Sequence, residues 1–390
     1  MRQPHCTITP AVVRSLARST LQQTLPWRPY GRRVSVHRLI DLLLLVASVG
    51  SSLSAVARRF RFGFSHETAR QAVHANLAGL DALTDQLADA LYSFADRSWR
   101  KRAWDIAIDL HYVPFYGDRK TPGILGGQKK QGTSYFYAYA TAVLIHRRRR
   151  YTVGLMSLPR NGKPHEVVAA LLAQVQSRGL RVRGVALDSG FDSGETLLLL
   201  QEQRLSYVVP LRRKGRGNNR RNACFALPAG TITTVQWVTE DSRRPVKTQA
   251  VVVRRRAESE VGVYAFGGWG EQAAVSVLRR SRQAQRAYRR RFGIETSYRQ
   301  MNECKAKTTK KDGVWRLLLV GLALLLRQAW VWLTWQLARS RRARPTQWLG
   351  ELPLRRMLDW LAEELRKRYK EERSIDLRPP LADRSATVAA

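Results

Sequence analysis

The sequence predicts a mixed α/β protein with a helical region before the sheet and more helices after it. Over the first ~95 residues the apolar positions follow the helical repeat, whereas from Ala103 onward they alternate as they do in strands. The central segments are predicted to be three strands, a helix, a strand, a helix and a strand, without the repeating βαβ units of a doubly wound fold. A mostly β-rich block over residues 222–268 separates this core from the last helices.

The expected elements of the core follow from these patterns. Its strands cover residues 103–117, 133–145, 150–159, 181–188 and 206–211, and its helices cover 165–179 and 193–204. Two further helical stretches are expected at 275–301 and 313–370.

The charge of the chain indicates a polyanionic partner. Its 390 residues include 68 Lys and Arg against 30 Asp and Glu, a net charge of +38. So many like charges repel one another in the compact state, so a partner such as nucleic acid or an anionic membrane is expected. The most apolar run, residues 317–326, is shorter than the about 20 residues that span a bilayer, so it predicts a buried core helix. We therefore expect nucleic acid and no membrane.

The start of the chain and its cysteines indicate a cytoplasmic protein. The first ten residues lack the apolar region of a signal peptide. Cys6, Cys224 and Cys304 lie far apart without the spacing of a metal site, so they are expected to be reduced.

A short pair of helices in the N-terminal region predicts a helix-turn-helix. Leu53, Val56, Ala57 and Phe60 recur at i, i+3, i+4 and i+7, and Ser65 can cap a second helix. The pair is a candidate for DNA recognition. The alternative is an ordinary pair of packed helices, which is common in helical domains.

Three carboxylates stand out by their positions. Asp109 lies within an apolar strand, where an acid is costly unless it binds something. Asp188 ends a second apolar strand, at the edge where α/β folds bind ligands. Glu295 lies on a basic helix. The structural alternatives are a satisfied core acid for Asp109, a cap for Asp188 and a salt-bridge partner for Glu295.

These acids on two strands and a helix are suited to holding one or two Mg²⁺ ions, with Mn²⁺ able to substitute. Such a site would activate an attacking hydroxyl and stabilise a leaving oxygen in phosphoryl transfer. Tyr288, Arg291, Glu295 and Tyr298 fall at i, i+3, i+7 and i+10, so they share one helix face. Arg299 flanks that face and, with its neighbours, can hold phosphates.

At these residues the chain resembles the DDE transposases of bacterial and archaeal insertion sequences, in particular the hairpin-forming cut-and-paste branch with a ribonuclease H-like core. The first motif is "AIDLHYVPFYG" and the second is "ALDSGFDSGETLLLLQEQRLSYVVPLRR". The third is a Tyr-x2-Arg-x3-Glu signature matched by Tyr288, Arg291 and Glu295. The resemblance covers roughly residues 100–335 and implies that Asp109, Asp188 and Glu295 are the catalytic, metal-binding acids.

The resemblance also implies DNA contacts. The family signature continues with a lysine where this chain has Asn302, and Arg299 and Lys305 are the cations that can substitute for it. Trp237 in the β-rich block would stack on a flipped base, the alternative being a core tryptophan. The expected DNA-binding residues are Tyr288, Arg291, Tyr298, Arg299, Lys305 and Trp237.

The function implied is metal-dependent strand cleavage and strand transfer at the terminal inverted repeats of the protein's own element, through hairpin ends, and insertion into target DNA. A homodimer in a synaptic complex and a nucleoid-associated location in a prokaryote are expected with it. The alternatives are a nuclease or resolvase on the same core, and a catalytically inactive DNA-binding protein. The expected domains are a helical DNA-binding domain (1–98), a ribonuclease H-like core (99–212 and 271–335), a β-rich insertion (213–270), C-terminal helices (336–374) and a flexible tail (375–390).

Overall fold

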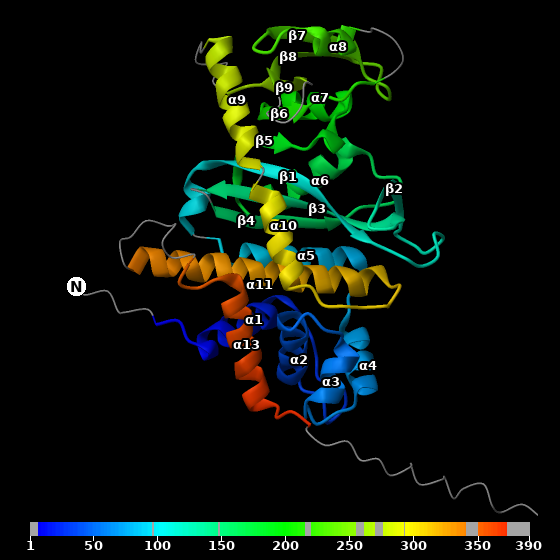
Figure 1. Cartoon of the computed structure of the whole chain (residues 1–390), viewed down its shortest axis with the longest axis vertical. Coiled ribbons are helices and arrows are strands. Elements are labelled where there is room, and N and C mark those ends of the chain that lie inside the picture. The colour runs from blue at the N-terminus through cyan, green and yellow to red at the C-terminus, as the bar shows by residue number, and fades with distance from the viewer. Residues whose placement is uncertain are drawn as a thin grey trace, which may run out of the picture.

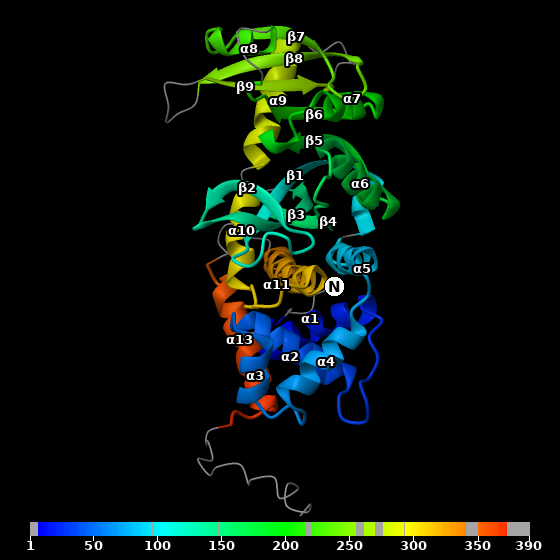
Figure 2. The same ribbon diagram turned by 90° about the vertical axis from the view of Figure 1, so that its right-hand side faces the viewer.

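The computed structural model describes residues 7–95, 97–146, 149–214, 220–254, 261–269, 276–291, 293–340 and 350–372. The chain forms an elongated molecule with helices at one end, a sheet in the middle and the strands β7 (Ile232–Val238), β8 (Pro245–Arg254) and β9 (Val261–Gly267) at the other end (Figures 1 and 2). Cys6, two arginines between the expected strands 133–145 and 150–159 (residues 147–148), and the expected tail at 375–390 lie outside the described residues.

Five helices form the N-terminal region. They are α1 (Pro10–Thr24), α2 (Val36–Ser48), α3 (Leu53–Arg59), α4 (His66–Asn76) and α5 (Leu80–Tyr92). Ser35, Ser52 and Ser65 cap α2, α3 and α4, each side-chain oxygen accepting a backbone N–H of the first turn. The expected pair of helices at 53–76 is therefore present, with Ser65 as the cap of the second.

One continuous sheet forms the centre. Its strands are β1 (Ala103–Pro114), β2 (Leu125–Lys130), β3 (Thr133–His146), β4 (Arg149–Ser157), β5 (Arg181–Leu187), β6 (Ser206–Pro210), β7 (Ile232–Val238), β8 (Pro245–Arg254) and β9 (Val261–Gly267). Their order is β2-β3-β1-β5-β6-β9-β8-β7, with β4 on the same edge of β3 as β2. β1 pairs antiparallel with β3 and parallel with β5, and β5 pairs parallel with β6.

The structure differs from the expectation at two places in this sheet. β2 was missed, because "LGGQKK" is exposed along nearly its whole length and shows no apolar alternation. The expected β-rich block continues the central sheet, since β9 pairs antiparallel with β6. The mixed-sheet fold class, with its order of strands and helices, is otherwise confirmed.

Helices cover both faces of the sheet. α6 (Pro164–Ser177) and α7 (Gly194–Glu202) lie on one side, and α9 (Val277–Arg291) and α10 (Gly293–Glu303) lie on the other (Figures 1 and 2). The short elements are α8 (Arg220–Ala223) and the 3-10 turns η1 (Arg97–Lys101), η2 (Ser189–Phe191) and η3 (Cys224–Ala226).

The single helix expected at 275–301 is present as two helices, α9 and α10, with residue 292 outside the described part of the chain. The Arg150 guanidinium donates to the backbone carbonyl of Arg290 and lies against Gly293. A Cβ on Gly293 would come within 2.6 Å of Arg150 Nε, so a larger residue there would displace the Arg150 guanidinium from this contact.

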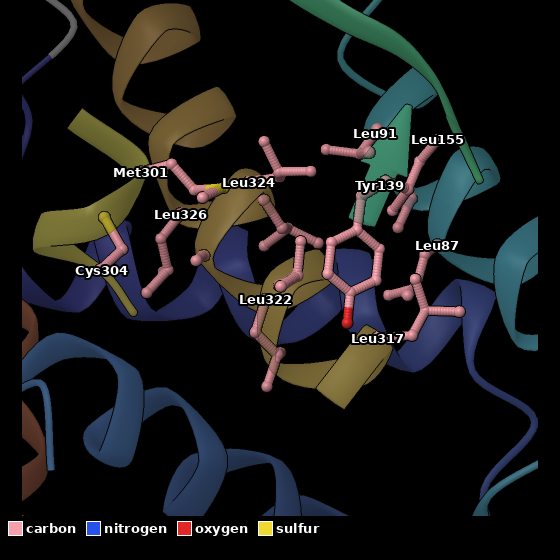
Figure 3. Packing of buried hydrophobic residues seen from close by; sticks show 14 of the residues in the cluster. Leu87, Leu91, Tyr139, Leu155, Met301, Cys304, Leu317, Leu322, Leu324 and Leu326 are labelled. Atoms are coloured by element: carbon pink, nitrogen blue, oxygen red, sulfur yellow. The ribbon is translucent and has the colours of Figure 1, made fainter. Parts of the chain in front are cut away.

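The long helix α11 (Gly313–Ser340) lies between the sheet and the N-terminal helices (Figure 1). Its stretch Gly313–Ala338 has the length of a membrane span, and an 18-residue window within it has a mean hydropathy of 1.8, but 94% of that window is buried inside the protein. Leu317, Leu322 and Leu324 pack there against side chains of α5 and the sheet (Figure 3). The buried core helix expected at 317–326 is thus confirmed, although it is longer than the apolar run.

The C-terminal helix α13 (Leu354–Arg368) returns to the N-terminal helices α1 and α2 (Figure 1). Asp41 of α2 is fully buried, accepts hydrogen bonds from Arg14 of α1 and accepts another from the Tyr369 hydroxyl. This network joins α1 and α2 to the end of α13, which is far from them in sequence.

Candidate active site

Asp109 lies in the centre of the sheet. Its strand β1 runs between β3 and β5, with Asp109 opposite Thr141 of β3. The residue is 6% exposed, and its Oδ1 accepts a hydrogen bond from the backbone N–H of Leu110 at 2.9 Å. A carboxylate in such a position needs a cationic partner to remain charged.

Asp188 follows the last residue of β5. Ile108 pairs with Leu187 in the parallel register, so the next residue of each strand, Asp109 and Asp188, falls at the same edge of the sheet. The Asp188 side chain is 34% exposed and begins the short turn Ser189–Phe191. The register of two parallel strands therefore brings the first two acids together.

Arg291 and Glu295 belong to the helices that pack on this face. Arg291 is the last residue of α9, and Glu295 lies in the first turn of α10 with its side chain 57% exposed. The Arg291 side chain is only 4% exposed, and its Nη2 donates to the Tyr288 hydroxyl at 3.3 Å.

The Arg291 guanidinium lies among all three acids. Its Nη1 is 2.9 Å from Asp109 Oδ2, and its Nη2 is 3.4 Å from Asp188 Oδ1 and 3.7 Å from Glu295 Oε1. The structure thus brings together Asp109, Asp188 and Glu295 from β1, the end of β5 and α10. The sequence indicated the three acids but not the cation in their centre.

The three acids offer carboxylate oxygens, which are the ligands that a hard divalent cation prefers. Their spacing is set by the guanidinium, and among the described residues no group of three His, Cys, Asp or Glu side chains is arranged as metal ligands. The three acids would therefore hold a metal only after Arg291 moves away from between them.

Burial sets the electrostatics of Asp109. Loss of hydration raises the pKa of this carboxyl to about 6, Arg291 opposes the rise, and the charges of Asp188 and Glu295 add to it. A cation bound beside Asp109 would favour the ionised form and so lower this pKa.

Two tyrosines support the cluster from inside the protein. Tyr298 is 9% exposed, donates to the Asp109 carbonyl at 3.1 Å and shares a hydrogen bond with Thr141 at 2.7 Å. Burial raises the pKa of Tyr298 well above its usual value, so it remains a neutral phenol. Tyr288 is also buried, and its ring lies 5.1 Å from the Arg291 guanidinium. In this structure both rings and Arg291 are covered, whereas Arg299 is exposed.

Trp237 lies on β7 beside a hollow of about 660 Å³ that begins at Ser189, directly after Asp188. The guanidinium of Arg221 sits 5.1 Å from its ring. Arg221 also pairs with the fully buried Asp192 carboxylate, which accepts a hydrogen bond from the Arg212 backbone. Asp192 is thus a structural anchor for this hollow.

Asn302 and Lys305 do not lie in the hollow beside Trp237. Both line a second hollow, together with the end of β1. Burial lowers the pKa of Lys305, and the nearby Arg316 lowers it further. The tyrosines of this hollow, Tyr112 and Tyr116, were not predicted as site residues, because the stretch "HYVPFYG" has no pattern that distinguishes them.

One acid lies within β1, one directly after β5 and one on a covering helix, on a sheet with the order β3-β1-β5-β6. This arrangement is consistent with a ribonuclease H-like core. Residues 101–326 match the family described as "Transposase DDE domain", which is more than half of the chain. The chain therefore belongs to this family of DNA transposases, enzymes of phosphoryl transfer on DNA.

The fold agrees with this assignment. The chain is similar to the piggyBac transposase in its synaptic complex with hairpin DNA, with a TM-score of 0.57 and 11% identity, covering 94% of this chain and 83% of that one. At this identity the likeness concerns the fold alone, and it confirms the expected fold class. No curated protein sequence matches the chain.

Proposed function

We propose that the protein excises and inserts its own DNA element by metal-dependent strand cleavage and strand transfer at the element's terminal inverted repeats. The observation that carries the proposal is the convergence of Asp109, Asp188 and Glu295 on the single cation Arg291. In a transposase family such a cluster is the natural place for cleavage and joining of phosphodiesters.

In this proposal Asp109, Asp188 and Glu295 hold Mg²⁺, or Mn²⁺ in its place. The bound ions would supply a polarised phosphate and a hydroxide at neutral pH, and two ions would serve both the attacking and the leaving oxygen. Arg291 would exchange its carboxylate partners for a phosphate oxygen when DNA arrives, since a guanidinium binds either anion. The buried tyrosines would keep β1 and α10 in place.

DNA would approach from the surface where Arg299 is exposed. Trp237 would receive a flipped base, because its hollow of about 660 Å³ begins beside Asp188 and carries basic side chains such as Arg212 and Lys214. The similarity to a transposase in a synaptic complex with hairpin DNA supports DNA as the partner and a hairpin route. Double-stranded element ends as substrate and a homodimer belong to the same proposal. Helices α3 and α4 would recognise the terminal repeats.

The setting that we propose is an insertion sequence of a prokaryote, with the protein in the cytoplasm at the nucleoid. The net charge of +38 supports a lasting association with nucleic acid. The proposed units are the helical DNA-binding region, the catalytic core and the β-rich insertion.

A cleavage assay on a plasmid that carries the DNA flanking the gene tests the function. With Mg²⁺ or Mn²⁺ we expect cuts at the element boundary, and Glu295→Gln should lower their rate by about 10³-fold or more. Glu303→Gln is the matched control, because Glu303 lies on the same helix but is exposed at its other end.

The same assay separates the alternatives. Cuts at the element boundary without joining to a target plasmid would indicate a nuclease or resolvase and contradict the transposase function. Specific binding of the ends without cuts by the wild type would make it an inactive DNA-binding protein. If Glu295→Gln cuts DNA as fast as the wild type, Glu295 has no role in catalysis.

A further inference from the structure

The second hollow beside the acids has the composition of a binding site. It measures about 950 Å³ and lies between the end of β1 with its following loop, the β2–β3 turn and the segment that joins α10 to α11. We call it the lysine–tyrosine groove, after Lys130, Lys305, Lys307, Lys311, Tyr112 and Tyr116.

The groove is strongly cationic. Four lysines and Arg316 line it, and no aspartate or glutamate of the described chain does so. None of these five cations forms an ion pair with a described carboxylate, although Asp312 lies next to Lys311. Instead Asp312 Oδ1 caps the start of α11 by accepting the Val314 N–H at 2.9 Å. Unpaired lysines in a concave surface attract a polyanion.

Two tyrosine rings are exposed at this groove. Tyr112 is 37% exposed and Tyr116 is 71% exposed, which is unusual for large side chains in this protein. The Tyr116 hydroxyl donates to the Gln131 carbonyl at 2.8 Å, so its ring is held while its surface faces water. Tyr112 packs edge-on against Phe136 and has the Lys130 ammonium 5.7 Å from its ring. Proteins that bind single-stranded nucleic acid stack its bases on exposed aromatic rings and hold its phosphates with nearby cations.

The groove lies next to the acid cluster along β1. Tyr112 follows Asp109 by three residues, a rise of about 10 Å along the strand, and its side chain points to the opposite face of the sheet. Between them His111 stacks at 4.7 Å on Tyr298, which itself bonds the Asp109 carbonyl. His111 also lines the groove, and its buried Nε2 has no hydrogen-bond partner in the described part of the chain. A buried ring nitrogen without a protein partner can bond a water molecule or a ligand in the groove.

We propose that the lysine–tyrosine groove binds a short single-stranded DNA segment beside the scissile phosphate. Its bases stack on Tyr112 and Tyr116 and its phosphates contact the lysines. The inference rests on the proposed function for the identity of the nucleic acid, and it adds a site where the unpaired strand at a cut end is held. Duplex DNA fits less well, since the exposed rings have no base faces to meet in a stacked helix.

Binding of fluorescent oligo-dT and of a matched duplex, measured by anisotropy in EDTA, tests the proposal. The double variant Tyr112→Ala/Tyr116→Ala should bind the single strand at least about tenfold more weakly, with the duplex affinity little changed. The variant Tyr112→Phe/Tyr116→Phe keeps both rings, so its affinity should remain close to that of the wild type.

The lysines have a matched control on the same strand. Successive side chains of β2 point to opposite faces, and Lys130 lines the groove whereas Lys129 does not. Lys130→Gln should reduce the salt dependence of single-strand binding by about 0.7 in logarithmic slope. Lys129→Gln should leave the slope unchanged.

Photocrosslinking of an iodouracil strand to the wild type is independent of variant folding, and the crosslinks should fall on residues 111–117. Equal weakening of single strand and duplex by the alanine variant would overturn the proposal in favour of a grip on duplex backbone. Unchanged binding, or crosslinks elsewhere, would also overturn it. A protein that fails to cut element ends but binds single strands through these tyrosines would refute the transposase proposal and leave the groove intact.

Discussion

Arg291 donates a hydrogen bond from Nη1 to Oδ2 of Asp109 at 2.9 Å, between side chains that are 4% and 8% exposed. The contact joins the end of α9 to the middle of β1, and it places a positive charge where three carboxylates meet. The same guanidinium stabilises the acids without a metal, and under the proposed function it occupies the place that a metal would take.

Replacing Arg291 should therefore strengthen metal binding in the absence of DNA. Without the guanidinium the three acids repel one another, so a cation gains more on binding. We expect Arg291→Gln to bind Mn²⁺ at least about tenfold more tightly at pH 8, a difference of about 1.4 kcal/mol, as measured by electron paramagnetic resonance or calorimetry.

Arg299→Gln is the control for this experiment, because Arg299 is an exposed arginine on α10 that bonds only Thr296 among the described contacts. Its Mn²⁺ affinity should equal that of the wild type. Equal or weaker Mn²⁺ binding by Arg291→Gln would show that the guanidinium does not compete with the metal.

Because Asp109 is buried, the free energy of unfolding should decrease as the pH rises from about 4 to about 6 in metal-free buffer. Its pKa in the folded protein, about 6, lies above the ordinary value of 3.8, so the folded state binds more protons in this interval. Unfolding therefore becomes easier as the pH rises, and the change levels off above the folded pKa. A shift of this size corresponds to an effect on the order of 3 kcal/mol.

Asp109→Asn removes the titration, so the stability of the variant relative to the wild type should rise with pH across this interval. Urea unfolding of both proteins at several pH values in EDTA measures it. A constant difference from pH 4 to pH 7 would contradict the assignment of the raised pKa to Asp109.

The network around Asp41 should hold the C-terminal helix on the N-terminal helices. Asp41→Ala leaves the Arg14 guanidinium buried without its partner, which costs about 3–5 kcal/mol. Tyr369→Phe removes one hydrogen bond, of 2.7 Å, to a charged group and should cost about 1.5–3 kcal/mol. Thermal and urea unfolding give both values.

The exposed pair Arg59–Glu371 provides the comparison for this network. Arg59→Gln should change the free energy of unfolding by less than about 1 kcal/mol, because solvent screens such a pair. A similar loss for Arg59→Gln and Asp41→Ala would mean that burial is not what makes the Asp41 network strong.

Gln328 should stabilise the packing of α11 against the sheet. Its side-chain oxygen accepts from the Thr152 N–H at 3.0 Å, and its amide donates to the carbonyls of Thr152 at 3.0 Å and Leu91 at 3.2 Å. Gln328→Met leaves these buried backbone groups without partners, so we expect a loss of about 2–4 kcal/mol. Gln336→Met, about two turns further along the helix, should cost under about 1 kcal/mol, and equal losses in urea unfolding would refute this role.

Local pattern determined much of this protein from the sequence. The alternation of β1, β3 and β5, the serine cap of α4 and the apolar core of α11 are properties of neighbouring residues, so short-range rules reveal them. Asp109, Asp188 and Glu295 were recognisable because each breaks the local rule for its segment.

Tertiary structure decided what no local pattern contains. The position of Arg291 among the acids depends on where α9 ends over β1, and Gly293 allows that packing because Arg150 lies against its backbone. The pairing of β9 with β6 and the return of α13 to Asp41 are contacts between distant segments. Their free energy comes from burial and charge in the assembled fold, which spacing along the chain does not record.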